Sequence, residues 1–465
     1  MASVYETKRV NVYPKTMQQQ QQQQPKMMKL SNLDRQCPTL MYLVFFYKPT
    51  NYDYMYGTNT SVFSRLKEGL EETLSLWYPS AGRLSRNPND GKLNLWCNNG
   101  GAIMVEAYTQ TRMCDLGNLC HYNEFYEKLV YKPISNGDIS EMPLIVAQVT
   151  KFGCGGYSIG VGTSHALFDG QATFNFLSAW ASKSNFNQLN YSLDWHKPVH
   201  GRERLQLNSH PTTAKNQATA LPSCSAIQHL YQLIIQASPP SGMLNNPQLM
   251  VSSTNQDCIL KTFHFTSSMI DILKRGNYGL NNMVSACSSF EIVTAHLWKA
   301  RTKALGLRKD RMVCLQFAVD TRTRLAPPLS PGFSGNAYVL ASVALLAGEL
   351  ELASLETIVN KIKAAKNSIN NQYVSSYLEA LEGSGGALPP LRELTIVSDW
   401  TRTPFHKVNF GHHGQTTASA CPLVPPVPQV AYFMQSSKED KGIDVRIGLS
   451  SQILNAFSHY FLTLN

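Results

Sequence analysis

The sequence predicts a mixed α/β protein with two domains. Apolar runs of strand length alternate irregularly with amphipathic runs of helix length along the 465 residues, and no repeat of about 20 to 50 residues recurs. Hydrophobic residues make up 43% of the chain, enough for sizeable cores. Residues 185–240 are rich in Ser, Asn, Gln, His and Pro, a composition typical of a connecting segment. We therefore expect an N-terminal domain at 1–195, a linker at 196–225 and a C-terminal domain at 226–465.

Charge and cysteine content argue against several classes of function. The net charge is +10, but the basic residues are scattered and form no Lys/Arg-rich block with interleaved aromatics, so we expect no nucleic-acid partner. The ten cysteines include no CxxC pair and no regular framework, which argues against a zinc ribbon or a disulfide scaffold. No apolar run approaches the roughly 20 residues of a membrane span, and residues 1–15 lack the apolar core of a signal peptide. We expect a cytoplasmic protein.

Hydrophobic periodicity predicts the elements of the first half. Residues 4–14 alternate as an edge strand does, and the seven glutamines that follow at 18–24 are predicted to form a surface loop. The apolar run 39–48 predicts a buried strand, and the helical spacing of apolar side chains over 62–76 predicts an amphipathic helix. Residues 93–105 are predicted to form two short strands around an Asn-Asn-Gly-Gly turn.

The second half contains a comparable set of elements. Its predicted strands are 258–265, 312–320, 338–347, 394–400, 429–435 and 444–449. Its predicted helices are 226–236, one that starts within 267–274, 288–305, a long stretch at 352–377, and 452–463. Strands and helices thus occur in both halves, as the mixed α/β class requires.

One short turn dominates the functional interpretation. An apolar strand at 143–150, turn glycines, and a second strand at 158–163 predict a hairpin that delivers His165 at a strand end. Asp169 precedes a run with apolar side chains at helical spacing, and Asp is a good first residue for a helix because its carboxylate accepts from unpaired N–H groups. The three residues between His165 and Asp169 therefore span a strand-to-helix corner.

A histidine displayed at such a corner suits proton transfer. An imidazole has a reference pKa of about 6.5, so it can take a proton from a hydroxyl or an amine near neutral pH. Small residues around the corner let another backbone or a substrate approach the ring; they are Gly160, Gly162, Ser164, Ala166 and Gly170. The alternative is a hydrogen-bonded core histidine, and the corner alone does not decide between the two.

Several other catalytic motifs do not occur in the sequence. It contains no P-loop, no GxGxxG after a strand and no GxSxG, so nucleotide hydrolysis, a Rossmann cofactor and a serine nucleophile lose their usual support. His412 and His413 are adjacent and have no acidic residue three or four positions away, so we expect no metal site. One histidine base can serve direct acyl transfer, among other reactions, because a thioester donor is already activated.

Five motifs occur in the order typical of the plant BAHD acyl-CoA-dependent acyltransferases, and the chain resembles that family over almost its whole length. They are LSNLD at 30–34, YPSAGRL at 78–84, HALFDG at 165–170, SFEIVTAHLW at 289–298 and DTRTR at 320–324. The resemblance implies a chloramphenicol-acetyltransferase-like fold with the active-site channel between its two domains. It also implies that His165 is the general base. Asp169 would be structural, turned away from the cavity and paired with Arg322, although Arg322 and Arg324 could instead form a solvated surface pair.

The family's second signature, DFGWG, is where this chain departs. The matching residues are Asn409, Phe410, Gly411, His412, His413 and Gly414, so an amide replaces the acidic side chain and two histidines replace the Trp and the second Gly. In the family this motif shapes the channel near coenzyme A. The resemblance therefore implies that Asn409, Phe410, Gly411 and His412 line a donor channel together with Ser398. Trp400, near Ser398, could line the channel or belong to the core.

Together, these observations predict an acyltransferase for groups other than aminoacyl groups. By resemblance it would use an acyl-CoA co-substrate, hold no resident cofactor and act as a monomer on a plant specialised metabolite, a lipid or a steroid-type hormone. We expect transfer to a hydroxyl in preference to an amine. Two alternatives stay open: a binding or scaffold protein that does not use His165, and a peptide-synthetase-like condensation domain, whose carrier-protein neighbours do not occur in this sequence.

Overall fold

The chain divides into two compact units, which are described separately. Unit 1 contains Met1–Gln206, Leu329–Ala337 and Thr403–Val424, and unit 2 contains Leu207–Pro328, Tyr338–Arg402 and Pro425–Asn465. The computed structural model describes residues 3–15, 26–49, 61–134, 137–184, 195–207, 224–237, 258–278, 287–382, 391–411, 419–424, 429–436 and 442–464. The glutamines at 18–24 and the side chains of His412 and His413 lie outside these residues.

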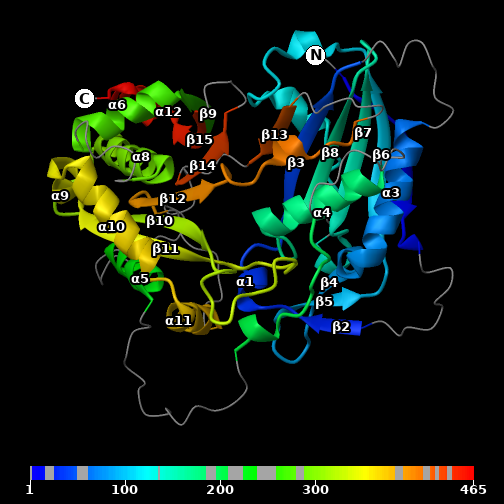
Figure 1. Ribbon diagram of the computed structural model, residues 1–465, viewed down its shortest axis with the longest axis horizontal. Coiled ribbons are helices and arrows are strands. Elements are labelled where there is room, and N and C mark those ends of the chain that lie inside the picture. Colours follow the sequence, from blue (N-terminus) through cyan, green and yellow to red (C-terminus); the bar gives the residue numbers. More distant parts are fainter. Residues whose placement is uncertain are drawn as a thin grey trace, which may run out of the picture. The chain divides into compact units, whose positions relative to one another are not determined.

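Unit 1 is built on a six-stranded sheet with the order β1-β6-β7-β8-β3-β13 (Figure 1). Its strands are β1 Tyr5–Val12, β3 Leu40–Tyr47, β6 Ala102–Thr109, β7 Ile145–Phe152, β8 Tyr157–Ser164 and β13 Ser419–Leu423. Only β6 and β7 pair in parallel among these neighbours. Strand β8 lies between β7 and β3 and is buried along its whole length, so the residue that follows it starts from a rigid base. As predicted, β1 is an edge strand.

A smaller sheet and a set of helices complete unit 1. The sheet has the order β2-β5-β4, with bounds β2 Lys26–Lys29, β5 Leu93–Cys97 and β4 Arg83–Arg86. The α-helices are α1 Asn32–Arg35, α3 Val62–Leu76 and α4 Gly170–Lys183. Short 3-10 turns are η2 Tyr78–Ala81, η3 Met113–Leu116, η4 Glu124–Lys128, η5 Ile139–Glu141, η6 Glu203–Leu205 and η8 Phe405–Lys407.

Helices α3 and α4 pack against each other in unit 1. The predicted amphipathic stripe of α3 is confirmed, because Phe63, Leu66 and Leu70 are all buried. From α4, the buried Trp180 side chain donates its Nε1–H to the carbonyl of Leu66 at 2.8 Å. Apolar burial and this hydrogen bond together fix α4, and therefore also the turn that precedes it.

Unit 2 is a second mixed sheet with its own helices. The strand order is β11-β10-β12-β14-β15-β9, with bounds β9 Cys258–Phe265, β10 Met312–Asp320, β11 Tyr338–Leu346, β12 Leu394–Asp399, β14 Val430–Gln435 and β15 Ile443–Ser450. The helices are α5 Ser225–Ala237, α6 Ser267–Tyr278, α8 Ser289–Leu305, α9 Ala347–Leu352, α10 Leu355–Asn367, α11 Asn371–Glu382 and α12 Ser451–Leu462. The predicted strands 258–265 and 312–320 match β9 and β10.

Helix α8 is the central helix of unit 2. It begins after Ser288, whose side chain accepts from the N–H of Glu291 while Glu291 accepts from the N–H of Ser288, a reciprocal capping box. It contacts α6, α10 and α12, and most of its residues are buried. Within it, His296 is bonded through Nε2 to the carbonyl oxygen of Phe461, and burial lowers its pKa. His296 is therefore a core histidine of the kind considered as the alternative for His165.

Three sequence predictions differ from the structure. The strands predicted within 93–105 exist as β5 and β6, but they belong to different sheets because each finds its partners elsewhere. The helical stretch 352–377 is divided among α9, α10 and α11, since Ser354 caps the start of α10. Residues 329–337 and 403–424 lie in unit 1 and not with the rest of 226–465, and β13, within the second of these segments, adds to β3 in antiparallel register.

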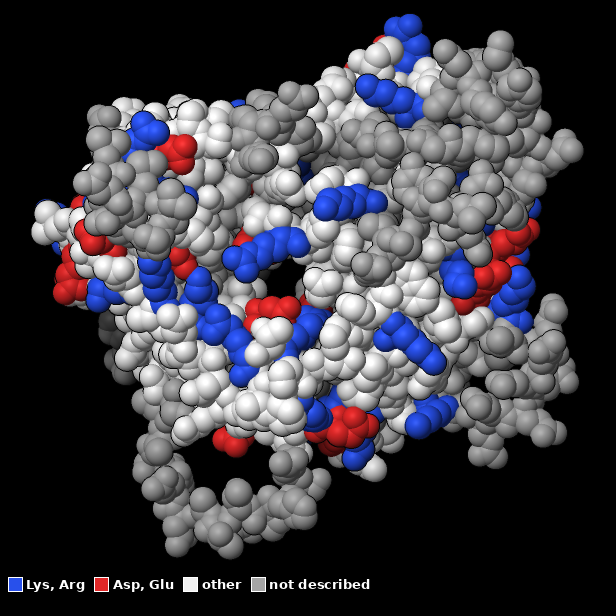
Figure 2. Space-filling model, in the orientation of Figure 1, with Lys and Arg blue, Asp and Glu red and all other residues white. Residues whose placement is uncertain are grey.

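On the face drawn in Figure 2, the Lys and Arg side chains of the described residues form no single basic stripe. There, blue Lys and Arg side chains lie dispersed over a mostly uncharged surface, and red Asp and Glu side chains are fewer. Within the described part of the chain, no helix combines the length and the apolar character needed to cross a membrane.

Candidate active site

The β7–β8 hairpin places His165 at the end of a buried strand, as predicted. Strand β8 ends at Ser164, whose N–H donates to the carbonyl of Leu144 at 2.8 Å. The next N–H, that of His165, donates to the carbonyl of Thr39 at 2.9 Å and so extends the pairing between β8 and β3 by one residue. His165 itself is half-buried. Its position thus differs from that of the core residue His296.

A tight turn leads from His165 into helix α4. The N–H groups of Leu167 and Phe168 both donate to the carbonyl of Ser164, at 3.0 and 3.2 Å, and both side chains are buried. Asp169 then caps the helix, because its Oδ1 accepts from the N–H of Ala172 at 3.0 Å. The predicted N-cap role of Asp169 is confirmed. The two buried side chains hold the turn in place and so fix its conformation between His165 and Asp169.

A segment from far along the chain holds both ends of this turn. Asn336 donates its side-chain N–H to the carbonyl oxygen of His165 at 2.7 Å, and the N–H of Ala337 donates to Oδ2 of Asp169 at 3.0 Å. Both residues belong to segment 329–337, which lies in unit 1, and both are fully buried. Neither residue was expected from the sequence. The short turn-like run Ser334-Gly335-Asn336-Ala337 is too small a signal to separate from any other loop.

The LSNLD motif lies under the same turn. Its last residue, Asp34, accepts from the N–H and the side-chain amide of Asn336 through Oδ1, at 2.9 and 3.0 Å. The Oδ2 atom accepts from Nε of Arg202 at 2.8 Å, and Ser31 donates to it from both its backbone and its hydroxyl. Asp34 is 0% exposed and Arg202 is 2% exposed, so this is a buried ion pair whose lone pairs are satisfied by further donors.

Gly160 of β8 makes room for protein and not for a ligand. A Cβ atom added at Gly160 would lie 2.0 Å from the carbonyl oxygen of Leu129, a distance that no side chain could tolerate. The sequence prediction allowed either a backbone or a substrate to approach here. At this position the approaching group is the backbone of the chain itself.

The two arginines of the DTRTR run occupy unit 2. Arg322 is buried, its N–H donates to Oδ1 of Asp320 at 2.8 Å, and its Nη1 lies 3.4 Å from Oδ2 of the same residue. Arg324 is half-buried and donates from Nη1 to the carbonyl of Lys366 at 2.9 Å. Neither residue is therefore simply a solvated surface charge. The pairing of Arg322 with Asp169 stays a prediction.

The segment that matches DFGWG keeps the local turn despite its altered sequence. Oδ1 of Asn409 accepts from the N–H of Gly411 at 2.7 Å, so the amide oxygen performs the hydrogen bonding that a carboxylate oxygen could supply. The Phe410 ring is fully buried between Phe45 and Trp180, with edge contacts to both. The Phe410 side chain is therefore part of the core of unit 1. Its predicted place along a donor channel stays a prediction.

Three polar side chains bond to the backbone of Phe410: those of Arg65, Tyr47 and Tyr157, whose hydroxyl donates to the Phe410 carbonyl at 3.4 Å. The buried guanidinium of Arg65 donates to the carbonyls of Phe410 and Ser184, at 2.8 and 2.7 Å, and burial lowers its pKa. The Tyr47 hydroxyl accepts from the N–H of Phe410 at 3.0 Å. This segment is consequently fixed to α3, α4 and β3 before any ligand is considered. The donor-channel roles of Asn409 and Gly411 stay predictions, and His412 lies outside the described residues.

Ser398 and Trp400 lie at the end of β12 in unit 2. The Trp400 indole donates its Nε1–H to the Ser398 hydroxyl at 2.9 Å, and its ring makes an edge contact with Tyr432. Both residues are half-buried. The indole has core contacts on one side and remains partly accessible, so the two roles considered for it are not mutually exclusive.

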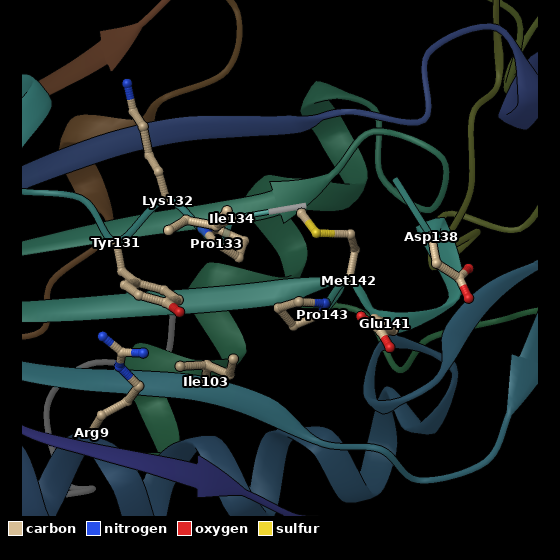
Figure 3. A pocket seen from close by; sticks show the side chains of 10 residues that line it. All are labelled: Arg9, Ile103, Tyr131, Lys132, Pro133, Ile134, Asp138, Glu141, Met142 and Pro143. Carbon is tan, nitrogen blue, oxygen red and sulfur yellow. The ribbon is translucent and has the colours of Figure 1, made fainter. Parts of the chain in front are cut away.

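A surface hollow of about 570 Å³ in unit 1 contains none of the predicted site residues (Figure 3). Its lining mixes cations, carboxylates and apolar side chains: Arg9, Ile103, Tyr131, Lys132, Pro133, Ile134, Asp138, Glu141, Met142 and Pro143. Arg9 is already bonded to both carboxylate oxygens of Glu6 and stacks over the ring of Tyr131 at 4.8 Å. The hollow therefore offers no set of groups that converges on one ligand, and we do not assign the active site to it.

Comparison with known proteins defines the class. A family model described as the Transferase family matches residues 3–464. Among solved structures, vinorine synthase aligns with a TM-score of 0.69 at 20% identity, over 98% of this chain and 96% of that one. TRI101 of F. sporotrichioides, complexed with coenzyme A and T-2, aligns with a TM-score of 0.63 at 14% identity, over 93% of this chain and 97% of that one. The fold is the chloramphenicol-acetyltransferase-like α/β fold that the sequence predicted.

More similar relatives narrow the class to acyltransferases. Brassinosteroid-related acyltransferase 1 of Arabidopsis thaliana is 52% identical, over 98% of this chain and 97% of its own length. Omega-hydroxypalmitate O-feruloyl transferase of the same plant is 28% identical, over 94% of this chain and 88% of its own length. The chain therefore belongs to the BAHD acyltransferase family, and it is an acyltransferase for groups other than aminoacyl groups.

Proposed function

We propose that this protein transfers an acyl group from a CoA thioester to a hydroxyl of a plant small molecule, with His165 as the general base. The observation that carries the proposal is the placement of His165: a half-buried histidine at a strand end, with its N–H bonded to Thr39 and its carbonyl bonded to Asn336. His296, by contrast, is buried within α8. A ring presented on a rigid and partly open turn fits a base that must meet a substrate.

The reaction can be written with this one titrating group. The imidazole takes the proton of the acceptor hydroxyl while the oxygen attacks the thioester carbonyl. The tetrahedral intermediate then collapses, the C–S bond breaks, and the coenzyme A thiolate leaves and takes the proton back from the imidazolium. The protein lowers the barrier by holding two substrates together and by removing one proton, and no covalent acyl-enzyme is needed.

The acceptor class is inferred from relatives. The name of the 52% identical relative refers to brassinosteroids, and the name of the 28% identical relative refers to transfer to the oxygen of an ω-hydroxy fatty acid. Both names fit a hydroxyl on a large apolar skeleton. The acyl donor is inferred to be a CoA thioester from the coenzyme A found in the TRI101 complex. Transfer to nitrogen is the second candidate, because two anthranilate N-benzoyltransferases of Dianthus caryophyllus match at 27% and 26% identity.

Release of free coenzyme A tests the proposal directly. The purified protein is incubated with acetyl-CoA, malonyl-CoA, a long-chain acyl-CoA or a hydroxycinnamoyl-CoA, together with steroid alcohols, ω-hydroxy fatty acids or aromatic amines. We expect thiol release that depends on an alcohol acceptor and falls at least about 100-fold in His165→Ala. The matched control is His121→Ala, which removes an exposed histidine of unit 1 and should retain activity within about twofold.

Each outcome decides between the candidates. Acceptor-dependent release with amines alone would replace O-acylation by N-acylation. Retention of a third or more of the activity in His165→Ala would remove His165 from the chemistry. No release with any donor would favour a family member that keeps the fold as a binding or scaffold protein.

A further inference from the structure

The buried side chain of Asn336 contacts His165 at its peptide group and not at its ring. Its amide nitrogen donates one hydrogen to the carbonyl oxygen of His165 at 2.7 Å and the other to Oδ1 of Asp34 at 3.0 Å. Both neighbours are oxygens that cannot donate, so the NH₂ group must face them and the orientation of the amide is fixed. Asn336 is 0% exposed, and solvent cannot replace either bond.

The partner of Asn336 is itself immobilised. Asp34 accepts from Nε of the buried Arg202 at 2.8 Å, and Arg202 also donates from Nη2 to the carbonyl of Ser334 at 3.0 Å. Ser334 lies two residues before Asn336. Arg202 therefore bonds both to the Asp34 carboxylate, which accepts from the Asn336 amide, and to the backbone two residues before Asn336. Breaking a buried pair of this kind is costly, because each partner would leave the other uncompensated.

Residues 334–337 form hydrogen bonds with both ends of the turn between His165 and Asp169. Asn336 bonds to the carbonyl of His165, and the next residue, Ala337, bonds through its N–H to the carboxylate of Asp169. On its other side, His165 donates its own N–H to the carbonyl of Thr39 at 2.9 Å. With N–H and C=O both bonded, the backbone at His165 has little freedom. The direction of its Cα–Cβ bond, which aims the imidazole, is set by these contacts.

We propose that Asn336 is a positioning residue for His165. Its amide fixes the His165 peptide and so the aim of the imidazole, and the buried Asp34–Arg202 pair exists to hold that amide in place. Asn336 touches no reacting atom in this assignment. The kinetic part of the proposal rests on the proposed general-base role of His165, whereas the structural part, the clamping of residues 164–170, does not.

The kinetic experiment compares two buried asparagines of unit 1. Asn336→Ala removes the bond to His165 but keeps the backbone N–H that bonds Asp34. The control, Asn94→Ala, removes a buried amide in β5 that accepts from Arg35 and is not bonded to His165. We expect Asn336→Ala to lower kcat at least tenfold with both KM values within about twofold, because misaimed proton transfer affects the transition state and not ground-state binding. Asn94→Ala should change kcat by less than about twofold. Equal kcat losses in the two variants would overturn the proposal.

Amide hydrogen exchange tests the bond between Asn336 and the His165 carbonyl without any catalytic turnover. In Asn336→Ala we expect the peptide that covers 164–170 to lose protection from exchange about tenfold or more, while β7 keeps its wild-type protection. In Asn94→Ala the 164–170 peptide should keep its wild-type protection. Unchanged protection in 164–170 would overturn the proposal even if activity fell. If the protein shows no transferase activity at all, this measurement still decides whether Asn336 clamps the turn, so failure of the proposed function is seen separately.

A second substitution covers the case in which Asn336→Ala does not fold. Asn336→Asp keeps the shape but replaces the donor by an oxygen that faces two other oxygens, the His165 carbonyl and Asp34. Protonation restores one O–H donor, and a neighbouring carboxylate favours the protonated form. We expect the ratio of variant to wild-type kcat to rise at least threefold between about pH 8 and about pH 6. Taking the ratio cancels the titration of groups common to both proteins. A constant ratio would show that donation to the His165 carbonyl does not matter.

Discussion

Replacing Asp169 by alanine should cost stability at two separate contacts. Oδ1 of Asp169 accepts from the N–H of Ala172 in the first turn of α4, and Oδ2 accepts from the N–H of Ala337, each at 3.0 Å. The side chain is 7% exposed, so water is poorly placed to substitute for either oxygen. The Asp169→Ala variant therefore loses a helix cap and also leaves a buried donor without its acceptor.

The two losses can be estimated separately. Removing an N-cap side chain costs about 1 kcal/mol, with a range of roughly 0.5 to 2. Leaving the N–H of Ala337 buried and unsatisfied costs about 1 to 3 kcal/mol. The two ranges add to about 1.5 to 5 kcal/mol of unfolding free energy, which is large for a single substitution. A purely catalytic residue would show no such loss, so the magnitude distinguishes a structural Asp169 from a second acid–base group.

Equilibrium unfolding in urea checks this estimate against a matched variant. Asp138 is also an aspartate N-cap, but it is exposed, and the hydrogen bonds described for its carboxylate come from Ser140 alone. Asp138→Ala should therefore cost about 0.5 to 1 kcal/mol, since water can solvate the released N–H. If Asp169→Ala loses no more than Asp138→Ala, the bridging role of Asp169 is wrong. A stable Asp169→Ala protein that has lost all activity would instead assign Asp169 to the chemistry.

Two further predictions concern residues outside the turn. Burial lowers the pKa of His200 from 6.5 to about 4, so the unfolded chain binds its proton first. The stability that comes from keeping His200 neutral is fully present above its unfolded-state pKa of 6.5, and it is lost as the pH falls toward the folded-state pKa of about 4. His200 alone should remove about 2 kcal/mol of unfolding free energy between about pH 7 and about pH 5, a loss that should be absent in His200→Leu; an equal pH dependence in both proteins would refute it. In Asn409→Asp, the oxygen that accepts from Gly411 is retained, so the melting temperature should stay within about 2 °C, whereas KM for the acyl-CoA should change more than KM for the acceptor. Equal changes in both KM values would argue against a place for Asn409 near the donor.

The sequence by itself determined the features whose signals lie within a few residues of each other. The hairpin, the turn from His165 to Asp169 and the cap of α4 follow from alternation, turn glycines and an Asp before a helical run. Strands β9 and β10 match their predicted bounds for the same reason. Such patterns are read from backbone geometry and local burial, which neighbouring residues largely decide.

Pairings across long stretches of chain were decided by the tertiary structure alone. Asn336 lies 171 residues from His165 and 302 residues from Asp34, and nothing in a Ser-Gly-Asn-Ala run announces either partner. Likewise, β13 joins β3, and the Phe410 ring packs between Phe45 and Trp180, partners that the local sequence does not specify. The physical reason is that complementary groups from distant parts of the chain position a buried amide or ring. A sequence pattern can predict that a residue is buried, but it does not identify the residues that pack against it.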